Sequence, residues 1–404
     1  MIEEKLLARL YALERKGIKL GLEPTRRLLA RCGNPQHSFT SIQIAGTNGK
    51  GSTAAMAASI LQSHGLVAGL YTSPHLLRFN ERIRVDGATI PDDYMVSWME
   101  RHSADIEAES STFFETTTTL ALCYFRDRGV QWAVLETGLG GRLDSVTAVE
   151  SSYSVICPIA MDHVEILGST LGAIATEKAG ILRSGVPCFS SPQQTEALDV
   201  LTARSKAVGA PFTVVDAHSG VPQPRQLFGA HQHGNAALAW EVTRAALGAD
   251  FSAETAGDAL RQVTWPGRYQ VLSNAPKVIF DVAHNLHGME ALLVALGAEQ
   301  ARGKRTAVLA LQRDKGADDV ARLLAPFFDT IIVTQTGIRN FLPAEELLRN
   351  MALYHASVST RHEPAQAVGA AMAAATLDDL VVILGSHYLG PAVARHFKIS
   401  FDNI

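Results

Sequence analysis

A glycine-rich loop between an apolar strand and an apolar helix constrains this sequence more than any other feature. Residues 39–44 are a short β-branched run that predicts a strand, and residues 53–64 are an Ala-rich run that predicts a buried helix. Between them stands Gly46-Thr47-Asn48-Gly49-Lys50-Gly51-Ser52. Glycines let backbone N–H groups approach phosphate oxygens, and the dipole of the following helix favours negative charge there. The segment therefore predicts a phosphate-binding loop.

Two side chains of this loop have the chemistry that a nucleoside triphosphate requires. Lys50 can neutralise the terminal phosphates, and the hydroxyl of Ser52 can reach a Mg²⁺ ion. The spacing departs from the ordinary phosphate loop, because only Thr47 and Asn48 separate the first two glycines and Gly51 follows the lysine. An ordinary strand-to-helix turn is the alternative for a bare glycine loop, but it does not explain the lysine and the serine.

Three further polar side chains follow the carboxyl ends of predicted strands: Ser73, Glu136 and His163. Open α/β sheets bind their ligands at this edge. We expect the three side chains to meet beside Lys50 and to complete a Mg²⁺ site there. Taken singly, each has a plainer interpretation: a helix cap, a surface carboxylate and a loop histidine.

Strands alternate with helices along two stretches of the sequence, which predicts mainly parallel sheets. The chain has 404 residues, 47% of them hydrophobic, enough for two cores. Residues 263–277, with Pro266, Gly267 and Pro276, are interpreted as a linker. We predict an α/β protein with a phosphate-loop domain at residues 1–270 and a smaller Rossmann-like α/β domain at residues 271–404.

Local patterns predict the individual elements. In the first part we expect two helices within residues 1–31, strands over 67–71, 132–135 and 153–159, a hairpin over 83–90, and helices over 92–108, with Asp92 as cap, and 114–128. In the second part we expect strands over 278–280, 306–311, 330–334 and 380–384.

Composition excludes several classes of partner. The net charge is −4 and charged residues make up 19% of the chain, which indicates neither a nucleic-acid nor a membrane-surface partner. The four cysteines form no CxxC pair and predict buried thiols in a reducing compartment. The charged N-terminus is unlike a signal peptide, and no apolar run has the length of a membrane span. We expect a cytoplasmic monomer.

Taken together, the motifs resemble the folylpolyglutamate synthase and dihydrofolate synthase family of the Mur ligase superfamily. The matching runs occur in order at residues 45–52, 72–76, 136–144, 161–163, 177–181, 265–268 and 281–285. The resemblance implies an ATP-dependent amide ligase, in which ATP phosphorylates a carboxylate and the amine of L-glutamate displaces phosphate from the acyl phosphate. Its substrates would be ATP, L-glutamate and dihydropteroate or a reduced folate.

The resemblance also implies roles for individual residues. The expected catalytic residues are Lys50, Lys178, His163 and Arg268. The expected nucleotide contacts are Gly46, Thr47, Asn48, Gly49, Lys50, Gly51, Ser52, Gln232, Asn235, Arg268, Asp281 and His284. The expected ligands of two Mg²⁺ ions are Ser52, Ser73, Glu136 and His163, with Lys178 carbamylated. Weaker candidates for substrate contacts are Ser386, Arg142 and Asp144.

Three positions depart from the family's usual pattern. Val282 stands where the family has glycine, Ser145-Val146-Thr147 where it has Ala-Thr-Asn, and His387 where it has leucine. Because valine requires a negative φ, we expect that this position does not need the positive φ that glycine allows. We expect none of the three to touch the residues that act on the phosphates, so the departures bear on the acceptor substrate, and the choice between dihydropteroate and a reduced folate stays open.

Two other functions are compatible with part of the pattern. A Mur ligase acting on a UDP-linked precursor would carry a UDP-binding domain before the loop, and too few residues precede Gly46 for one. A nucleotide-binding module without ligase activity would need the loop, but not Lys178, Asp281 or His284.

Overall fold

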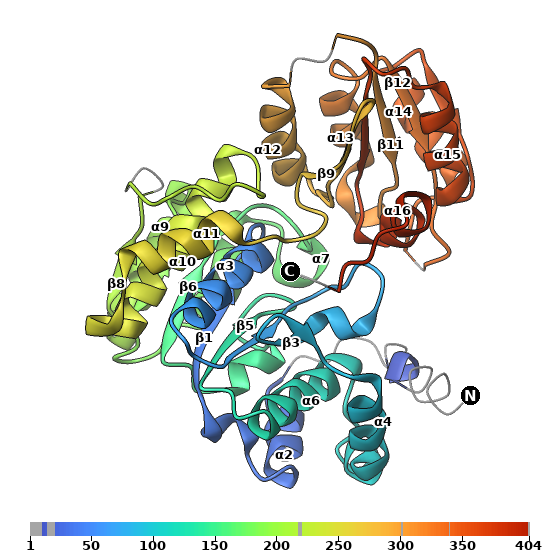
Figure 1. Cartoon of the computed structure of the whole chain (residues 1–404). Coiled ribbons are helices and arrows are strands. Elements are labelled where there is room, and N and C mark those ends of the chain that lie inside the picture. The colour runs from blue at the N-terminus through green and yellow to red at the C-terminus, as the bar shows by residue number, and fades with distance from the viewer. Residues whose placement is uncertain (1–9, 14–20, 217–219, 300–301, 339, 403–404) are drawn as a thin grey trace.

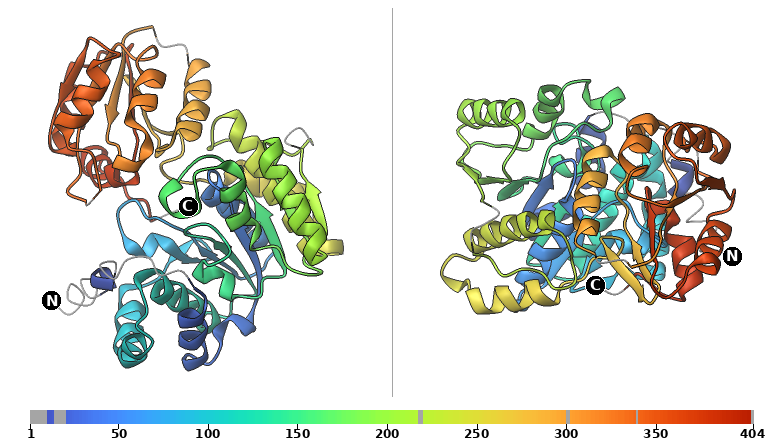
Figure 2. Two further views of the ribbon diagram at one scale, coloured as in Figure 1. Left: turned by 180° about the vertical axis from the view of Figure 1, so that it is seen from behind. Right: turned by 90° about the horizontal axis from the view of Figure 1, so that it is seen from above.

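The computed structural model describes residues 10–13, 21–216, 220–299, 302–338 and 340–402, and it has two α/β domains (Figure 1). The N-terminal domain is built on an eight-stranded sheet and the C-terminal domain on a six-stranded sheet. Figure 2 shows helices on both faces of each sheet, so each domain is a three-layer sandwich. The two-domain α/β prediction is confirmed.

The N-terminal sheet has the strand order β4-β3-β2-β5-β1-β6-β7-β8 and is parallel except at the β2–β3 and β3–β4 pairs. Its strands are β1 (Thr40–Ala45), β2 (Ala68–Tyr71), β3 (Ile83–Val85), β4 (Ala88–Thr89), β5 (Trp132–Glu136), β6 (Tyr153–Ile156), β7 (Cys188–Ser190) and β8 (Phe212–Val214). The predicted hairpin is β3–β4.

Helices cover both faces of this sheet because its central strands are apolar on both sides. The helices are α2 (Glu23–Arg31), α3 (Lys50–Ser63), α4 (Asp92–Arg101), α5 (Ser103–Ala108), α6 (Phe113–Asp127), α7 (Val164–Leu167), α8 (Leu171–Ala179), α9 (Thr195–Val208), α10 (Ala230–Leu247) and α11 (Ala253–Gln262). Helices α3, α10 and α11 share one apolar cluster with the sheet, and α2, α4 and α6 share another.

The C-terminal sheet has the order β13-β12-β11-β14-β10-β9, and only the β9–β10 pair is antiparallel. Its strands are β9 (Gln270–Asn274), β10 (Lys277–Phe280), β11 (Arg305–Leu309), β12 (Thr330–Val333), β13 (Val358–Thr360) and β14 (Leu380–Leu384). Its helices are α12 (Leu286–Gly297), α13 (Ala317–Leu324), α14 (Ala344–Ala352), α15 (Pro364–Ala374) and α16 (Gly390–Phe397).

Strand periodicity divides the second core into two clusters. Ile279 packs with α12, α13 and α14, whereas its neighbours Val278 and Phe280 pack with α15 and α16 on the opposite face. Successive side chains of a strand point to opposite faces, so a continuous apolar run serves both clusters.

The structure differs from the predicted elements at residues 92–108, at the cap of the first of their helices, and in the predicted linker. Residues 92–108 form two helices, because the backbone leaves helical geometry at His102, whose ring packs 4.9 Å from that of Trp98. Pro91 is the cap residue of α4, and Asp92 accepts hydrogen bonds from Arg78 and Asn80 instead of capping. The predicted linker contains strand β9, which forms only because it pairs with β10.

Three short strands, β7, β8 and β13, were not predicted from the sequence. Each has three residues, too few for a periodicity to be recognised. Of the two helices predicted within residues 1–31, the second is α2, and most of the first lies outside the described residues. All four cysteines are buried free thiols, as predicted.

Candidate active site

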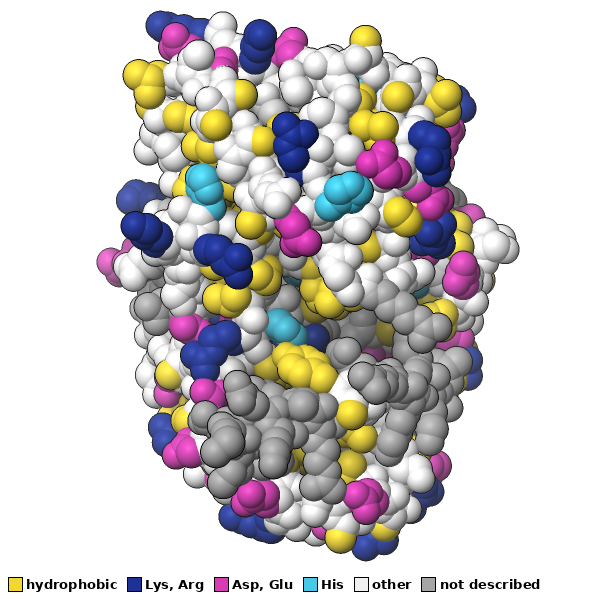
Figure 3. Space-filling view, turned by 90° about the vertical axis from the view of Figure 1, so that its right-hand side faces the viewer, with side chains coloured by type: hydrophobic (Ala, Val, Ile, Leu, Met, Phe, Trp, Pro, Cys, Tyr) yellow, Lys and Arg dark blue, Asp and Glu magenta, His cyan; other side chains and the backbone are white. Residues whose placement is uncertain are grey.

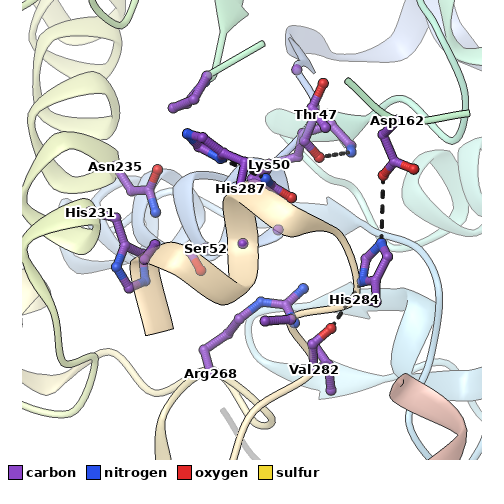
Figure 4. Close-up of a pocket in the computed structure, with 18 of the residues that line it drawn as sticks. Thr47, Lys50, Ser52, Asp162, His231, Asn235, Arg268, Val282, His284 and His287 are labelled. Carbon is purple, nitrogen blue, oxygen red and sulfur yellow. Dashed lines mark hydrogen bonds and ion pairs between the residues drawn. The ribbon is translucent and has the colours of Figure 1, made fainter. Parts of the chain in front are cut away.

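Four neighbouring strands carry the candidate residues of the N-terminal domain to one edge of the sheet. Strands β2, β5, β1 and β6 are adjacent and parallel, so their carboxyl ends lie side by side. Glu136 is the last residue of β5, and the segments that follow the other three strands lead to Ser73, the phosphate loop and His163. These segments line one cavity of about 390 Å³, which residues of the C-terminal domain complete (Figure 4).

The phosphate loop has the backbone that its glycines predict. Gly49 precedes helix α3 with a φ of +88°, which L side chains rarely adopt. A Cβ at Gly49 would lie 2.3 Å from Oδ1 of Asn235 on helix α10, so the loop also needs glycine for close packing. Asn235 in turn donates a hydrogen bond to Gln232 over 2.9 Å, which places both predicted nucleotide contacts beside the loop.

Lys50 begins helix α3 and points into the cavity. Its Nζ donates to the carbonyl of Thr47 over 3.1 Å and lies 4.0 Å from Oε1 of Glu136. Neither contact satisfies an ammonium that can donate three hydrogen bonds, so donor capacity is left for a phosphate.

Glu136 and Ser52 offer oxygen atoms that suit a divalent cation. Glu136 is buried, which raises the pKa of its carboxyl group, while Lys50 acts in the opposite direction. The backbone N–H of Ser73 donates to its Oε2 over 3.1 Å. The buried hydroxyl of Ser52 has no hydrogen-bond partner among the described residues. A buried carboxylate and an unsatisfied hydroxyl on one cavity wall fit Mg²⁺, which prefers oxygen ligands.

Lys178 and His163 reach the same cavity from the segments after β6. The Nζ of buried Lys178 donates to the carbonyl of Gly46 over 2.7 Å. Burial, and to a smaller extent Lys50, lower the pKa of Lys178 to about 7. His163 has a φ of +49° and its Nε2 lies 4.0 Å from Oδ2 of Asp162.

The C-terminal domain supplies the opposite wall through Asp281 and His284, and Arg268, in the segment just before β9, lies beside them. Asp281 is fixed by the backbone N–H groups of Tyr269 and Ala283, both at 2.7 Å. Burial lowers the pKa of His284 to about 4, so the ring is neutral at pH 7. Its Nδ1 lies 2.9 Å from the carbonyl of Val282 and must carry the proton, since a carbonyl only accepts.

Sequence reasoning assigned no role to a set of contacts that joins the two domains at the wall of the cavity, which Asn48 and Asp162 line. The buried Nζ of Lys315 lies 2.5 Å from Oδ1 of Asp162, and the Nδ2 of Asn285 donates to Oδ2 over 2.8 Å. Asn285 also exchanges hydrogen bonds with Asn48, both at 3.0 Å. Asp162 and Lys315 each come after the end of a strand, and this position was the signal that the sequence offered. The sequence does not show which strand ends face each other, because that depends on how the two domains pack.

The described residues contain one further group with the spacing of metal ligands: Asp162, His163 and Asp314. Asp162 already bonds Lys315 and Asn285. Burial alone would raise the pKa of Asp162, but its neighbours His163, Lys315 and His284 lower it. The carboxylate is already paired with the ammonium of Lys315, and we assign no ion to this group.

Three weaker substrate candidates are not among the residues that line the cavity: Arg142, Asp144 and Ser386. Arg142 pairs with Glu177 over 2.7 Å. Asp144 accepts hydrogen bonds from three backbone N–H groups of its own loop, and the hydroxyl of Ser386 accepts from the N–H of Tyr388. A substrate role for these three stays a prediction.

The departures from the family pattern have distinct surroundings. Val282 is not among the described residues with positive φ, as expected for valine, and its side chain packs in the C-terminal core. Residues 145–147 belong to a short 3₁₀ helix, Ser145–Ala148. His387 lines the cavity itself and contacts Arg268, contrary to the expectation that none of the departures touches a residue expected to act on the phosphates.

Figure 3 shows the surface hollowed where the two domains meet, with histidine and basic side chains at the hollow. The cavity thus has its walls in both domains.

Within the described ranges, every helix is too short or too polar to cross a bilayer.

Comparison with known proteins agrees with this geometry. The profile of the Mur ligase middle domain matches residues 44–188, and that of the Mur ligase glutamate ligase domain matches residues 267–387. The dihydrofolate synthase/folylpolyglutamate synthase of Bacillus subtilis is 31% identical over 414 aligned positions, which cover 95% of this chain and 96% of that protein.

Two solved structures are similar over almost the whole chain. Mycobacterium tuberculosis folylpolyglutamate synthase, complexed with ADP and AMPPCP, has a TM-score of 0.91 at 29% sequence identity. The match covers 98% of this chain and 99% of the Mycobacterium tuberculosis chain. A bifunctional folylpolyglutamate synthase/dihydrofolate synthase with Mn, AMPPNP and L-glutamate bound has a TM-score of 0.87 at 28% identity, with 98% of both chains covered. This chain therefore belongs to the folylpolyglutamate synthase/dihydrofolate synthase family of Mur ligases.

Proposed function

We propose that this protein is an ATP-dependent ligase that joins L-glutamate to the carboxylate of a pteroate or folate through an acyl phosphate, with release of ADP and phosphate. The observation that carries the proposal is that Lys50 and Glu136 of the N-terminal domain and Asp281 and His284 of the C-terminal domain line a single cavity, together with Arg268 of the connecting segment. A phosphate loop opposite a second polar wall can hold a nucleotide and a second reactant together. The relatives with ADP, AMPPNP and glutamate bound support the same reaction.

The residues of this chain fit the two chemical steps. Phosphoryl transfer depends mainly on positioning and on neutralising charge, and Lys50 and Arg268 are cations that line the cavity. Phosphorylation turns the carboxylate into an acyl phosphate, and the glutamate amine then attacks its carbonyl carbon and expels phosphate. Placing the two reactants in contact can contribute about 7–11 kcal/mol to lowering the barrier.

We propose that Ser52, Ser73, Glu136 and His163 would hold divalent cations at two sites. Bound there, the cations would neutralise phosphate charge during the transfer. The manganese in the relative supports a divalent cation in this family. The unsatisfied hydroxyl of Ser52 and the buried carboxylate of Glu136 support the first site in this chain.

We further propose that Lys178 is carbamylated. A neutral amine attacks CO₂, forms a C–N bond and loses a proton, which converts a cation into a carbamate with two oxygens. The lowered pKa of Lys178, about 7, supports this because it leaves much of the amine neutral at physiological pH. A buried ammonium near bound Mg²⁺ would instead be repelled.

The domain boundary that we propose, between residues 270 and 271, lies at the start of β9. The four buried free thiols support a reducing compartment, and we propose the cytoplasm. We also propose a monomer, which light scattering on the purified protein would test.

The deciding experiment measures ADP release from the purified protein with ATP and Mg²⁺, with and without L-glutamate, and with dihydropteroate or tetrahydrofolate as acceptor. We expect ADP release to require an acceptor and glutamate, with mass spectrometry detecting the glutamylated product. ATP turnover that ignores glutamate would indicate a nucleotide-binding module without ligase activity. No turnover with glutamate and either acceptor would instead favour a Mur ligase acting on a carboxylate that the assay does not supply.

A further inference from the structure

A histidine of the C-terminal domain lies between two residues of the proposed active site. His387 begins the short 3₁₀ helix His387–Leu389 that follows β14, and it lines the cavity. Its Nε2 lies 3.4 Å from Nη2 of Arg268, and its ring centroid lies 5.6 Å from that of His284. Residues far apart in the sequence therefore meet at one point of the cavity wall.

Arg268 has few other contacts to hold it in place. Among the described residues, the hydrogen-bond partners of its guanidinium are His387 and the carbonyl of Gly267, each at 3.4 Å. Asp281 and Glu136 attract it through their charge, but the oxygens of Asp281 accept from backbone N–H groups instead. Most of the five N–H donors of the guanidinium remain available for a phosphate.

The chemistry of the two side chains determines which of them donates the hydrogen bond and which accepts it. A guanidinium can only donate, so the Nε2 of His387 must accept, and the ring proton must then be on Nδ1. Burial, and then the positive charge of Arg268, keep the pKa of His387 well below its usual value. The ring is therefore neutral at pH 7 and its Nε2 lone pair is available.

We propose that His387 is a positioning residue, whose Nε2 accepts a hydrogen bond from Arg268 and holds the guanidinium toward the cavity before ATP binds. This inference rests on the proposed function, because it assumes that Arg268 acts on the transferred phosphoryl group. An arginine held in advance loses less rotational freedom when the phosphate arrives. His387 should therefore affect the rate of the step that uses Arg268 more than the affinity for ATP.

Substitutions of His387 distinguish its two nitrogens. Leucine in H387L removes both nitrogens and keeps an apolar side chain. Glutamine in H387Q places an amide oxygen near the position of Nε2, whereas asparagine in H387N places one near Nδ1. We expect H387L and H387N to lower kcat about tenfold with little change in KM for ATP, and H387Q to stay within about threefold of the unaltered enzyme.

A double-mutant cycle tests whether His387 acts through Arg268. Once Arg268→Met has removed the guanidinium, H387L should cause no further loss of kcat. Equal activity of H387L and the unaltered enzyme would overturn the inference, and so would a full further loss in the Arg268→Met background. Circular dichroism and thermal midpoints of each variant show whether the fold is intact.

A spectroscopic measurement tests the inference without turnover. With ¹⁵N-labelled histidine, long-range ¹H–¹⁵N spectra of the unliganded protein report the tautomer, and H387Q identifies the signals of His387. We expect the Nδ1–H tautomer at pH 7, whereas an Nε2–H tautomer or an imidazolium would overturn the inference. If the unaltered protein lacks ligase activity, the proposed function fails while the contact with Arg268 is still tested by the tautomer.

Discussion

The Nζ of Lys315 lies 2.5 Å from Oδ1 of Asp162, and this buried ion pair joins the C-terminal domain to the N-terminal domain at the wall of the cavity. Both side chains are almost entirely shielded from solvent, with 2% and 6% of their surface exposed. Asp162 precedes His163, a proposed metal ligand. The pair therefore links the packing of the two domains to the geometry of the proposed metal site.

Removal of this link should separate the domains. In Lys315→Met the carboxylate of Asp162 loses its cation, and a buried charge left without its partner costs about 3–5 kcal/mol. We expect a larger radius of gyration in solution scattering and a lower thermal midpoint. Lys206→Met, at an exposed position of helix α9, is the control. A scattering profile and midpoint equal to those of the control would contradict the role of the pair.

Substitution of Lys50 should abolish ligation and leave the fold intact. Lys50 is the lysine of the phosphate loop, and its Nζ makes one hydrogen bond to the protein, to Thr47. Removing a preorganised charge from a phosphoryl-transfer site lowers the rate about 100- to 1,000-fold. The measurement is kcat of Lys50→Met against the Lys206→Met control. Near-normal turnover by a folded Lys50→Met protein would refute the assignment.

Activity should depend on CO₂ through Lys178. We expect ¹³CO₂ to give a ¹³C carbamate signal in the unaltered protein that is absent from Lys178→Ala. We also expect bicarbonate to restore the activity of enzyme that was kept in buffer stripped of CO₂. Because burial lowers the pKa of Lys178 to about 7, the amine is protonated and unreactive toward CO₂ as the pH falls below that value, so carbamylation should decline there. Full activity of Lys178→Ala would exclude the modification as a requirement.

Catalysis should require the two domains to close around the substrates. Lys50 and Glu136 belong to one domain and Asp281 and His284 to the other, while Arg268 lies just before β9. We expect an ATP analogue with folate to make the protein more compact in solution scattering. We also expect Arg268→Ala to lower the rate far more than the affinity for ATP. An unchanged profile together with a normal rate in Arg268→Ala would rule out closure.

The C-terminal segment should stabilise the arrangement of the domains. The buried Arg84 of β3 donates to the backbone carbonyls of Phe401 and Asp402, and Phe401 packs in the C-terminal core. A hydrogen bond to a charged group contributes about 1.5–3 kcal/mol. We expect Arg84→Met to lower the thermal midpoint by several degrees, with Arg26→Met, whose side chain is 54% exposed, as the control. Equal thermal midpoints for the two variants would show that the hydrogen bonds of Arg84 to the C-terminal segment contribute nothing to stability.

The sequence alone determined the parallel architecture of the N-terminal domain and the residues at its strand ends. Ser73, Glu136 and the phosphate loop follow neighbouring parallel strands, and strands of this kind have all their carboxyl ends at one edge. Periodicity and glycine spacing are local properties of the chain, so they can be recognised without coordinates. The same reasoning anticipated a negative φ at Val282.

Tertiary structure alone decided which residues meet across the two domains. Lys315 and Asp162 are 153 positions apart, and Arg268 and His387 are 119 apart, so neither contact leaves a periodic signal in the sequence. Strand β9 illustrates the same limit, because its half-buried residues form a strand only by pairing with β10. Local patterns specify each sheet and the edge at which its ligands bind, whereas the packing of one domain on the other determines which side chains share the cavity.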